Sequence, residues 1–193
     1  MARPKAYDED TALEAAAELF WSRGYEAASM ADLESAMQMG RQSIYNAFGD
    51  KRSLFMKALD RYIRTNRERI ADSLLAPEAD LTTIREHFES MVEYWTTGPR
   101  RGCLVANSIL EVGEEDQGIA ASCQFNQQTV LDGFENALQN AVSTGQIPAG
   151  TDVEGTARML VAQVYGMTVL VKGGATKEEL SPIVDALLRG IES

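Results

Sequence analysis

Apolar residues recur along this chain at the three- and four-residue spacing of helices that bury one face, and no stretch alternates as a strand does. The first such face runs from Leu13 to Phe20. Asp8 can cap the start of that helix, and Gly24 can end it in a left-handed conformation that other residues resist. The opening segment is therefore predicted to be one helix bounded by Asp8 and Gly24.

Two short helices and one long helix are predicted next. Ser29 can cap a second helix, with Asp32 three residues later as a near capping box. After a few linking residues, a third helix is expected over about residues 41–47. Asp50 can then cap a long fourth helix, which is expected to end before the Ala-Pro pair at 76–77.

Five further helices are predicted, separated by segments that contain Gly or Pro, at about residues 80–97, 103–112, 115–144, 152–172 and 177–191. The predicted fold class is therefore all-α, with nine helices divided between a three-helix unit at residues 1–50 and a larger helical domain at residues 51–193. Between residues 157 and 171 the chain is apolar nearly all round, so this helix needs cover on every side. Because so short a chain has few elements left to cover it, we expect a partner subunit to cover this helix, and so a dimer.

Three helices in the first 48 residues, the last two short and closely connected, fit a helix-turn-helix. The second helix of such a pair must bury one side while it offers polar side chains to the major groove of DNA. Ile44 and Phe48 can anchor the third predicted helix, and its outward positions hold Arg41, Gln42, Ser43, Tyr45 and Asn46. Arg and Gln suit the edges of guanine and adenine, Tyr and Ser suit phosphates, and Asn can serve either. Any packed three-helix unit shows similar spacing, so this pattern alone leaves DNA binding and simple packing equally open.

Residues 17–30 (AELFWSRGYEAASM) and 43–51 (SIYNAFGDK), followed by Leu54 and Phe55, resemble the N-terminal signature of the TetR family of bacterial regulators. The segment at 145–152 is also similar to the loop that these proteins often place before their dimerising helix pair, which the resemblance puts at residues 152–172 and 177–191. The resemblance implies a homodimeric transcriptional repressor whose two reading heads bind a palindromic operator in double-stranded DNA. It also implies a cavity in each C-terminal domain, where a small-molecule effector of unknown identity binds and weakens the affinity for the operator.

Carried over by position, the resemblance puts the five outward residues of the third helix on the recognition helix. Lys51 corresponds to the family's phosphate-contacting lysine, at a helix start that itself favours an anion. Ser29 stands where the family often uses a hydroxyl to touch the DNA backbone. Glu34 and Gln38 replace the family's usual Ala and turn Gly, and Gly40 replaces the usual Ser or Thr cap, so the shape of the turn is left open.

The net charge of −11 is unusual for a protein that binds DNA, since such affinity comes largely from pairing cations with phosphates. Residues 1–69 hold 11 Lys and Arg against 11 Asp and Glu, so the whole excess of negative charge lies in residues 70–193. This asymmetry is weak support for nucleic-acid contact in the N-terminal third. The acidity keeps an alternative open, in which the chain is a helical small-molecule-binding protein or enzyme whose N-terminal motif no longer reads DNA.

Residues that could carry catalysis or bind a metal are scarce. His87 is the only histidine of the sequence. The residues therefore give little support for a multi-histidine metal site or for a nucleophile–histidine pair. We expect His87 to lie on a helix face without a chemical role. The acidic cluster at 111–116 is expected to be solvated. We predict no enzymatic activity, no metal and no cofactor. With no apolar run of the roughly 18–20 residues that a membrane span needs, and no secretory signal at the start, a cytoplasmic protein without a membrane partner is expected.

An effector pocket is expected among aromatic and methionine side chains of the C-terminal helices, together with one cysteine. The alternative for each of these side chains is ordinary packing in the core, which is more common in proteins. The predicted pocket residues are Phe88, Met91, Tyr94, Trp95, Cys103, Phe125, Met159, Tyr165 and Met167.

Cys103 is also a candidate sensor of oxidants or electrophiles. Cys103 and Cys123 are too few for a disulfide framework, so both are interpreted as thiols. Cys103 lies at a predicted helix start beside Arg100 and Arg101, and both features stabilise the reactive thiolate. The Gly-Cys-Leu-x-x-Asn sequence at 102–107 also resembles a segment of a TetR subgroup that includes sensors of electrophiles. The alternative is a small buried apolar group with no chemical role.

Overall fold

The computed structural model describes residues 8–192, and every regular element in that range is an α-helix. The helices of the described range are α1 (Glu9–Arg23), α2 (Met30–Met37), α3 (Arg41–Phe48), α4 (Lys51–Asp72), α5 (Leu81–Thr96), α6 (Leu104–Val112), α7 (Gln117–Ser143), α8 (Val153–Lys172) and α9 (Lys177–Glu192). The all-α prediction is confirmed, and each predicted helix lies within a few residues of an observed one. Residues 1–7 and residue 193, which the predicted domain limits include, lie outside the described range.

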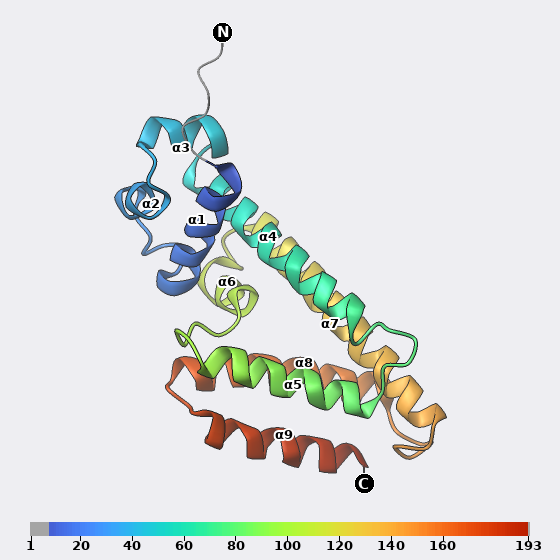
Figure 1. Cartoon of the computed structure of the whole chain (residues 1–193). Coiled ribbons are helices and arrows are strands. Elements are labelled where there is room, and N and C mark those ends of the chain that lie inside the picture. Colours follow the sequence, from blue (N-terminus) through green and yellow to red (C-terminus); the bar gives the residue numbers. More distant parts are fainter. Residues whose placement is uncertain (1–7, 193) are drawn as a thin grey trace.

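Helices α1, α2 and α3 form a head at one end of the molecule (Figure 1). Local hydrogen bonds fix where these helices begin. The side chain of Asp8 accepts from the backbone N–H of Asp10, and Ser29 and Asp32 form a complete capping box at the start of α2. Three buried side chains, Phe20, Leu33 and Ile44, bring the three helices together around a small core.

The turn between α2 and α3 closes although it lacks glycine. Gln38 takes the left-handed conformation with a φ of 51°, and its backbone N–H donates to the carbonyl of Glu34. A residue other than glycine costs roughly 1 kcal/mol in this region. Gly40 then caps α3 from an extended conformation with no side-chain hydrogen bond. The departures from the family pattern therefore remove stabilising features without preventing the turn from forming.

Helix α4 joins the head to the rest of the molecule, packing on α1 near its start and running beside α7 (Figure 1). The ring of Phe20 in α1 meets the ring of Phe55 in α4 edge-on, with 5.0 Å between centroids. Further along, Ile63 and Ile70 are buried. One continuous helix of 22 residues thus extends from the head into the C-terminal body.

Helices α5, α8 and α9 form the layer furthest from the head (Figure 1), with α5 packed on α9 and α7 packed on α8. Helix α8 buries one side but leaves Met159, Val169 and Leu170 with exposed fractions of 45%, 58% and 44%. The apolar surface that the sequence predicts for α8 is therefore only partly covered within one chain. In the part of the chain that the structure describes, no helix is long and apolar enough to cross a membrane.

Candidate functional site

Helix α3 has one buried side and one polar, exposed side. Ile44 and Phe48 point into the head, as predicted, and are buried. On the opposite side, Gln42 donates from Nε2 to Oδ1 of Asn46 at 3.0 Å, one helical turn away. Tyr45 keeps an exposed fraction of 40%. Of the five predicted recognition residues, Arg41, Gln42, Tyr45 and Asn46 are exposed and Ser43 is half-buried.

Lys51 begins α4 directly after α3, Ser29 caps α2, and both side chains already have partners within the head. The Lys51 ammonium donates to the backbone carbonyl of Glu26 at 3.2 Å and lies 4.6 Å from the centre of the Tyr25 ring. The hydroxyl of Ser29 donates to the Asp32 carboxylate at 2.6 Å, and hydrogen bonds from Ser29 lower the pKa of that carboxyl. Both side chains are therefore held in fixed positions at the edge of the head.

Two acidic side chains of the 111–116 cluster bond to distant parts of the chain, in contrast to the solvated cluster that the sequence predicted. The Glu111 carboxylate, at the end of α6, accepts from the backbone N–H groups of Tyr25 and Glu26 at 2.9 and 2.8 Å. Gly24 makes this approach possible, because a Cβ at that position would lie 2.7 Å from Oε1 of Glu111. The expectation of solvation is wrong for Glu111.

Asp116 is the second of these acids, and it joins α7 to α4. It caps α7 and accepts two hydrogen bonds from the Arg52 guanidinium, at 2.5 and 2.8 Å. The hydrogen bonds from Arg52 and from the backbone N–H of Ile119 lower the pKa of Asp116 to about 2. Glu114 and Glu115, from the same predicted cluster, are exposed. No group of three His, Cys, Asp or Glu side chains within residues 8–192 is arranged to hold a metal ion.

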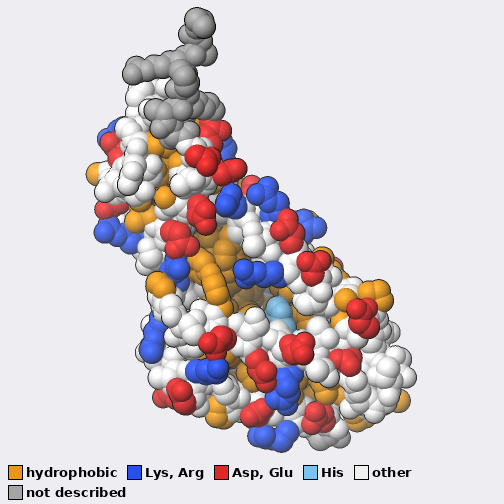
Figure 2. Space-filling model, in the orientation of Figure 1, with side chains coloured by type: hydrophobic (Ala, Val, Ile, Leu, Met, Phe, Trp, Pro, Cys, Tyr) orange, Lys and Arg blue, Asp and Glu red, His pale blue; other side chains and the backbone are white. Residues whose placement is uncertain are grey.

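A cavity of about 540 Å³ lies between the head and the body, lined by residues of α1, α4, α5, α7 and α8 and by Cys103 and Leu104 at the start of α6. Figure 2 shows the hollow in the surface, with hydrophobic side chains inside it and charged side chains around it. This volume is within the range of sites for small organic ligands. The predicted pocket residues that line it are Met91, Tyr94, Trp95, Cys103 and Tyr165.

The other four predicted pocket residues lie outside the cavity wall. Phe88 and Met167 are fully buried in the core, where the Phe88 ring stacks on Phe134. Phe125 and Met159 are instead exposed, with fractions of 54% and 45%. Each residue along a helix turns by about 100°, so the right helix does not guarantee the right face. The sequence identified the helices of the cavity more reliably than the side chains that face it.

Several residues of the cavity wall were not predicted, and the most informative are Trp21, Tyr62, Asn66, His87 and Asn126. Trp21 comes from α1, so the head itself contributes to the wall. The sequence contained a signal for Asn126, because it is a polar residue on an otherwise apolar face of α7. In the structure its side chain is 4% exposed. No comparable signal existed for Trp21, because its neighbours in the fold are far away in the sequence.

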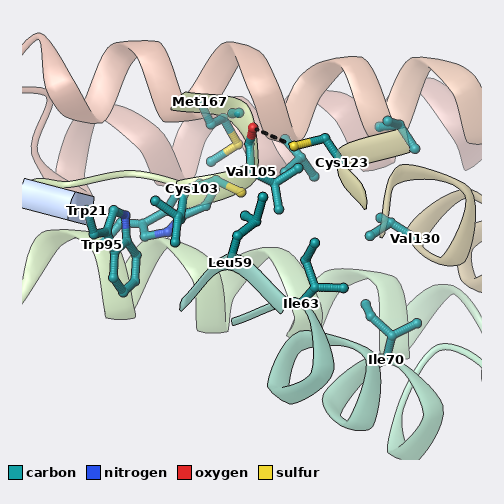
Figure 3. Close-up of a cluster of buried hydrophobic side chains, with 14 of the residues drawn as sticks. Trp21, Leu59, Ile63, Ile70, Trp95, Cys103, Val105, Cys123, Val130 and Met167 are labelled. Carbon is teal, nitrogen blue, oxygen red and sulfur yellow. Dashed lines mark hydrogen bonds between the residues drawn. The ribbon is translucent and has the colours of Figure 1, made fainter. Parts of the chain in front are cut away.

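Cys103 lies at the cavity as the N-cap residue of α6, beside Trp21 and Trp95 (Figure 3). The hydroxyl of Tyr62 donates to its Sγ at 3.7 Å. Burial raises the pKa of the Cys103 thiol, so the predicted stabilisation of the thiolate is wrong. The reason is that the Arg101 guanidinium pairs with Glu18 and lies over the Trp21 ring, while Arg100 donates to the carbonyl of Gly174.

Two family models cover most of the chain. One, described as bacterial regulatory proteins of the tetR family, matches residues 12–58, and the other, described as a Tetracyclin repressor-like C-terminal domain, matches residues 78–186. The chain belongs to the TetR family. As a TetR-family member it is a DNA-binding transcriptional regulator, and the first match contains α3 and the Lys51 region described above.

Relatives of known sequence and structure agree with this assignment. The HTH-type transcriptional repressor ComR of Escherichia coli K12 is 30% identical over 189 residues, which cover 97% of this chain and 90% of ComR. A cysteine mutant of the TetR family regulator CifR, in complex with 26-bp operator DNA, is 30% identical with a TM-score of 0.88, covering 98% of this chain and 100% of that one. The reduced form of NemR from E. coli shares the fold, with a TM-score of 0.81 at 18% identity, over 95% and 96% of the two chains.

Proposed function

We propose that this TetR-family chain is a repressor, without enzymatic activity, that acts in the cytoplasm. Two copies bind a palindromic DNA operator and are released when a small molecule occupies the cavity. The observation that carries the proposal is the polar, exposed side of α3, held outward by Ile44 and Phe48 in the chain's own head. The relationship to CifR, which was solved with operator DNA, supports the same function for this chain. The acidic body does not oppose it, because residues 1–69, which include the head and most of α4, hold 11 Lys and Arg against 11 Asp and Glu.

The proposed dimer is formed through α8 and α9. Met159, Val169 and Leu170 leave apolar surface on α8 that no other residue among 8–192 of the same chain covers. Gly166 lies on the same helix with no heavy atom within 4 Å of an added Cβ, so a second helix can approach the backbone closely there. Pairing of these faces covers the apolar surface and joins two heads into one DNA-binding unit.

Trp21 is the proposed link between the cavity and the head. Its indole Nε1 donates to the carbonyl of Gly102 at 3.0 Å, and its ring meets the Tyr62 ring edge-on at 5.1 Å. Since Trp21 belongs to α1 and lines the cavity, a molecule bound there contacts the head directly. Displacement of the indole tilts α1 relative to α4 and thereby changes the separation of the two recognition helices in the dimer.

Covalent modification of Cys103 is a second candidate mechanism for release of the operator DNA. The thiol borders the cavity, and the related CifR structure is of a cysteine mutant, while NemR was solved in a reduced form. With a maleimide, a bond forms between Sγ and one alkene carbon, the π bond breaks, and the thiol proton ends on the other carbon. Operator binding by Cys103→Ser, by Cys123→Ser as the matched control and by the wild type should be measured before and after N-ethylmaleimide. Protection by Cys103→Ser alone supports the route, and equal loss in all three proteins ends it.

The main proposal is tested with the DNA upstream of the chain's own gene in a gel-shift assay. The wild type should bind a specific palindromic site, and Tyr45→Ala and Lys51→Ala should lose specific binding. Asp132→Ala, an exposed change on α7, serves as a control and should bind as the wild type does. If the wild type binds no site more tightly than scrambled DNA of equal length, the alternative function as a ligand-binding protein or enzyme without DNA recognition replaces this one.

A further inference from the structure

Two polar side chains in the cavity wall, one buried and one half-buried, have hydrogen-bonding groups that the protein leaves unused. Asn126 in α7 is 4% exposed, and its Oδ1 accepts from Nδ2 of Asn66 at 2.9 Å. Within the described residues, no hydrogen bond uses the Nδ2 of Asn126, although every fully buried polar side-chain atom there has a partner. Its N–H groups are therefore satisfied from the cavity, by solvent or by a bound molecule.

His87 in α5 provides the second unused group. Its ring lies edge-on to the ring of Phe134, with 5.6 Å between centroids, and neither ring nitrogen bonds to a protein atom in the described range. Burial lowers the pKa of His87 to about 4, and no neighbouring charge contributes to the shift. At neutral pH the imidazole is therefore uncharged and offers one donor and one acceptor.

The charged residues of the cavity wall lie at its rim, where they pair with other side chains or face solvent. Arg61 lies 3.6 Å from the carboxylates of Asp10 and Glu14, and Glu18 pairs with Arg101. Arg69 lies over the ring of Tyr94, whose side chain is half-exposed. Asp72 and Glu86, the remaining charged residues of the wall, are exposed to solvent. The inner part of the cavity thus combines aromatic surface with polar groups that carry no charge.

We propose that the cavity binds an uncharged molecule with a flat, apolar body and one amide- or carbonyl-like group, oriented by Asn126 and His87. Four aromatic side chains, Trp21, Tyr62, Tyr94 and Trp95, provide the surface for the body. The carbonyl oxygen accepts from Nδ2 of Asn126, and an amide N–H donates to the bare nitrogen of His87. A carboxylate or ammonium group at the same depth loses its hydration without gaining an opposite charge, so such ligands are rejected. This inference rests on the proposed role of the cavity as the effector site.

Three probes of one shape and different charge test the inference: biphenyl-4-carboxamide, biphenyl-4-carboxylate and biphenyl-4-ylmethylammonium. Both tryptophans of the chain line the cavity, so their fluorescence reports binding to the full-length protein, and calorimetry provides a second measurement. The carboxamide should bind at least about 10-fold more tightly than either ion, because neither ion finds a compensating charge. Equal or tighter binding of an ion, or no binding of the carboxamide, overturns the inference.

Two substitutions make the test specific to the inner wall. Asn126→Leu should weaken the carboxamide by about 5- to 10-fold, as expected for loss of one hydrogen bond, and leave unsubstituted biphenyl unchanged. Asn126→Asp keeps the shape of the side chain, and this variant should bind the ammonium probe more tightly than the carboxamide. Gln139→Leu removes an exposed amide from the same helix and should change nothing. If Asn126→Asp still binds the carboxamide more tightly than the ammonium probe, as the wild type should, the inference is contradicted even if Asn126→Leu proves unstable.

The same proteins also separate this inference from the proposed function. If the carboxamide binds with the predicted charge preference but leaves operator binding unaltered, the cavity chemistry is correct and the effector role is wrong. If an ion binds and releases the operator, the effector role is correct and the assignment of an uncharged ligand is wrong.

Discussion

Glu111→Ala tests the connection between the head and the body most directly. The change removes two hydrogen bonds from a carboxylate to the backbone N–H groups of Tyr25, which is half-buried, and Glu26, which is exposed. A hydrogen bond to a charged group contributes about 1.5–3 kcal/mol when shielded and less when exposed to water, so the loss should be about 2 kcal/mol in the free energy of unfolding. For a chain of this size, that corresponds to a fall in Tm of about 4–8 °C.

The measurement is thermal unfolding followed by circular dichroism, with Glu115→Ala as the control. Glu115 is an exposed acid four residues away, so its replacement changes the net charge equally and should shift stability by less than about 0.5 kcal/mol. Glu111→Ala should also need more effector for operator release, because α6 no longer holds the loop after α1. A Tm of Glu111→Ala equal to that of Glu115→Ala refutes the assignment of Glu111 as the connector.

Two further predictions concern pH and assembly. The pKa of His87 is lowered to about 4 from an ordinary 6.5, so the unfolded chain takes up a proton first and stability should decline as pH falls from 6.5 towards 4. Denaturant unfolding at pH 7 and pH 5 should show the wild type losing about 1–2 kcal/mol more than His87→Phe; equal losses contradict this. Val169→Arg places a charge on the exposed face of α8 and should give a folded monomer by analytical ultracentrifugation, whereas an unchanged dimer excludes that face from the interface.

The helix boundaries were predictable because the residues that determine them are local. Asp8, Ser29 and Asp50 bond to backbone N–H groups two or three residues away, and Gly24 and Gly49 end helices with positive φ. The same holds for α3, whose buried and exposed sides follow directly from its spacing. Such signals lie within a few residues, so the sequence is sufficient to place them.

The cavity was predictable only in part because its wall is formed by tertiary packing. Phe88 and His87 are adjacent in α5, yet the aromatic residue packs in the core and the histidine faces the cavity. Arg101 pairs with Glu18, 83 residues away, and so does not stabilise a thiolate at Cys103. Neither the rotation of a helix nor the partner of a long side chain can be derived from local spacing alone.

Operator binding by Gln42→Ala tests the central claim, that α3 reads DNA bases, because Gln42 is exposed there and its loss leaves the core untouched. Fluorescence anisotropy should show a Kd for the operator raised about 10-fold or more, as expected when one base contact is lost, with binding to scrambled DNA unchanged. Gln128→Ala, an exposed amide on α7, should bind the operator as the wild type does. Equal operator affinity of Gln42→Ala and Gln128→Ala contradicts the claim.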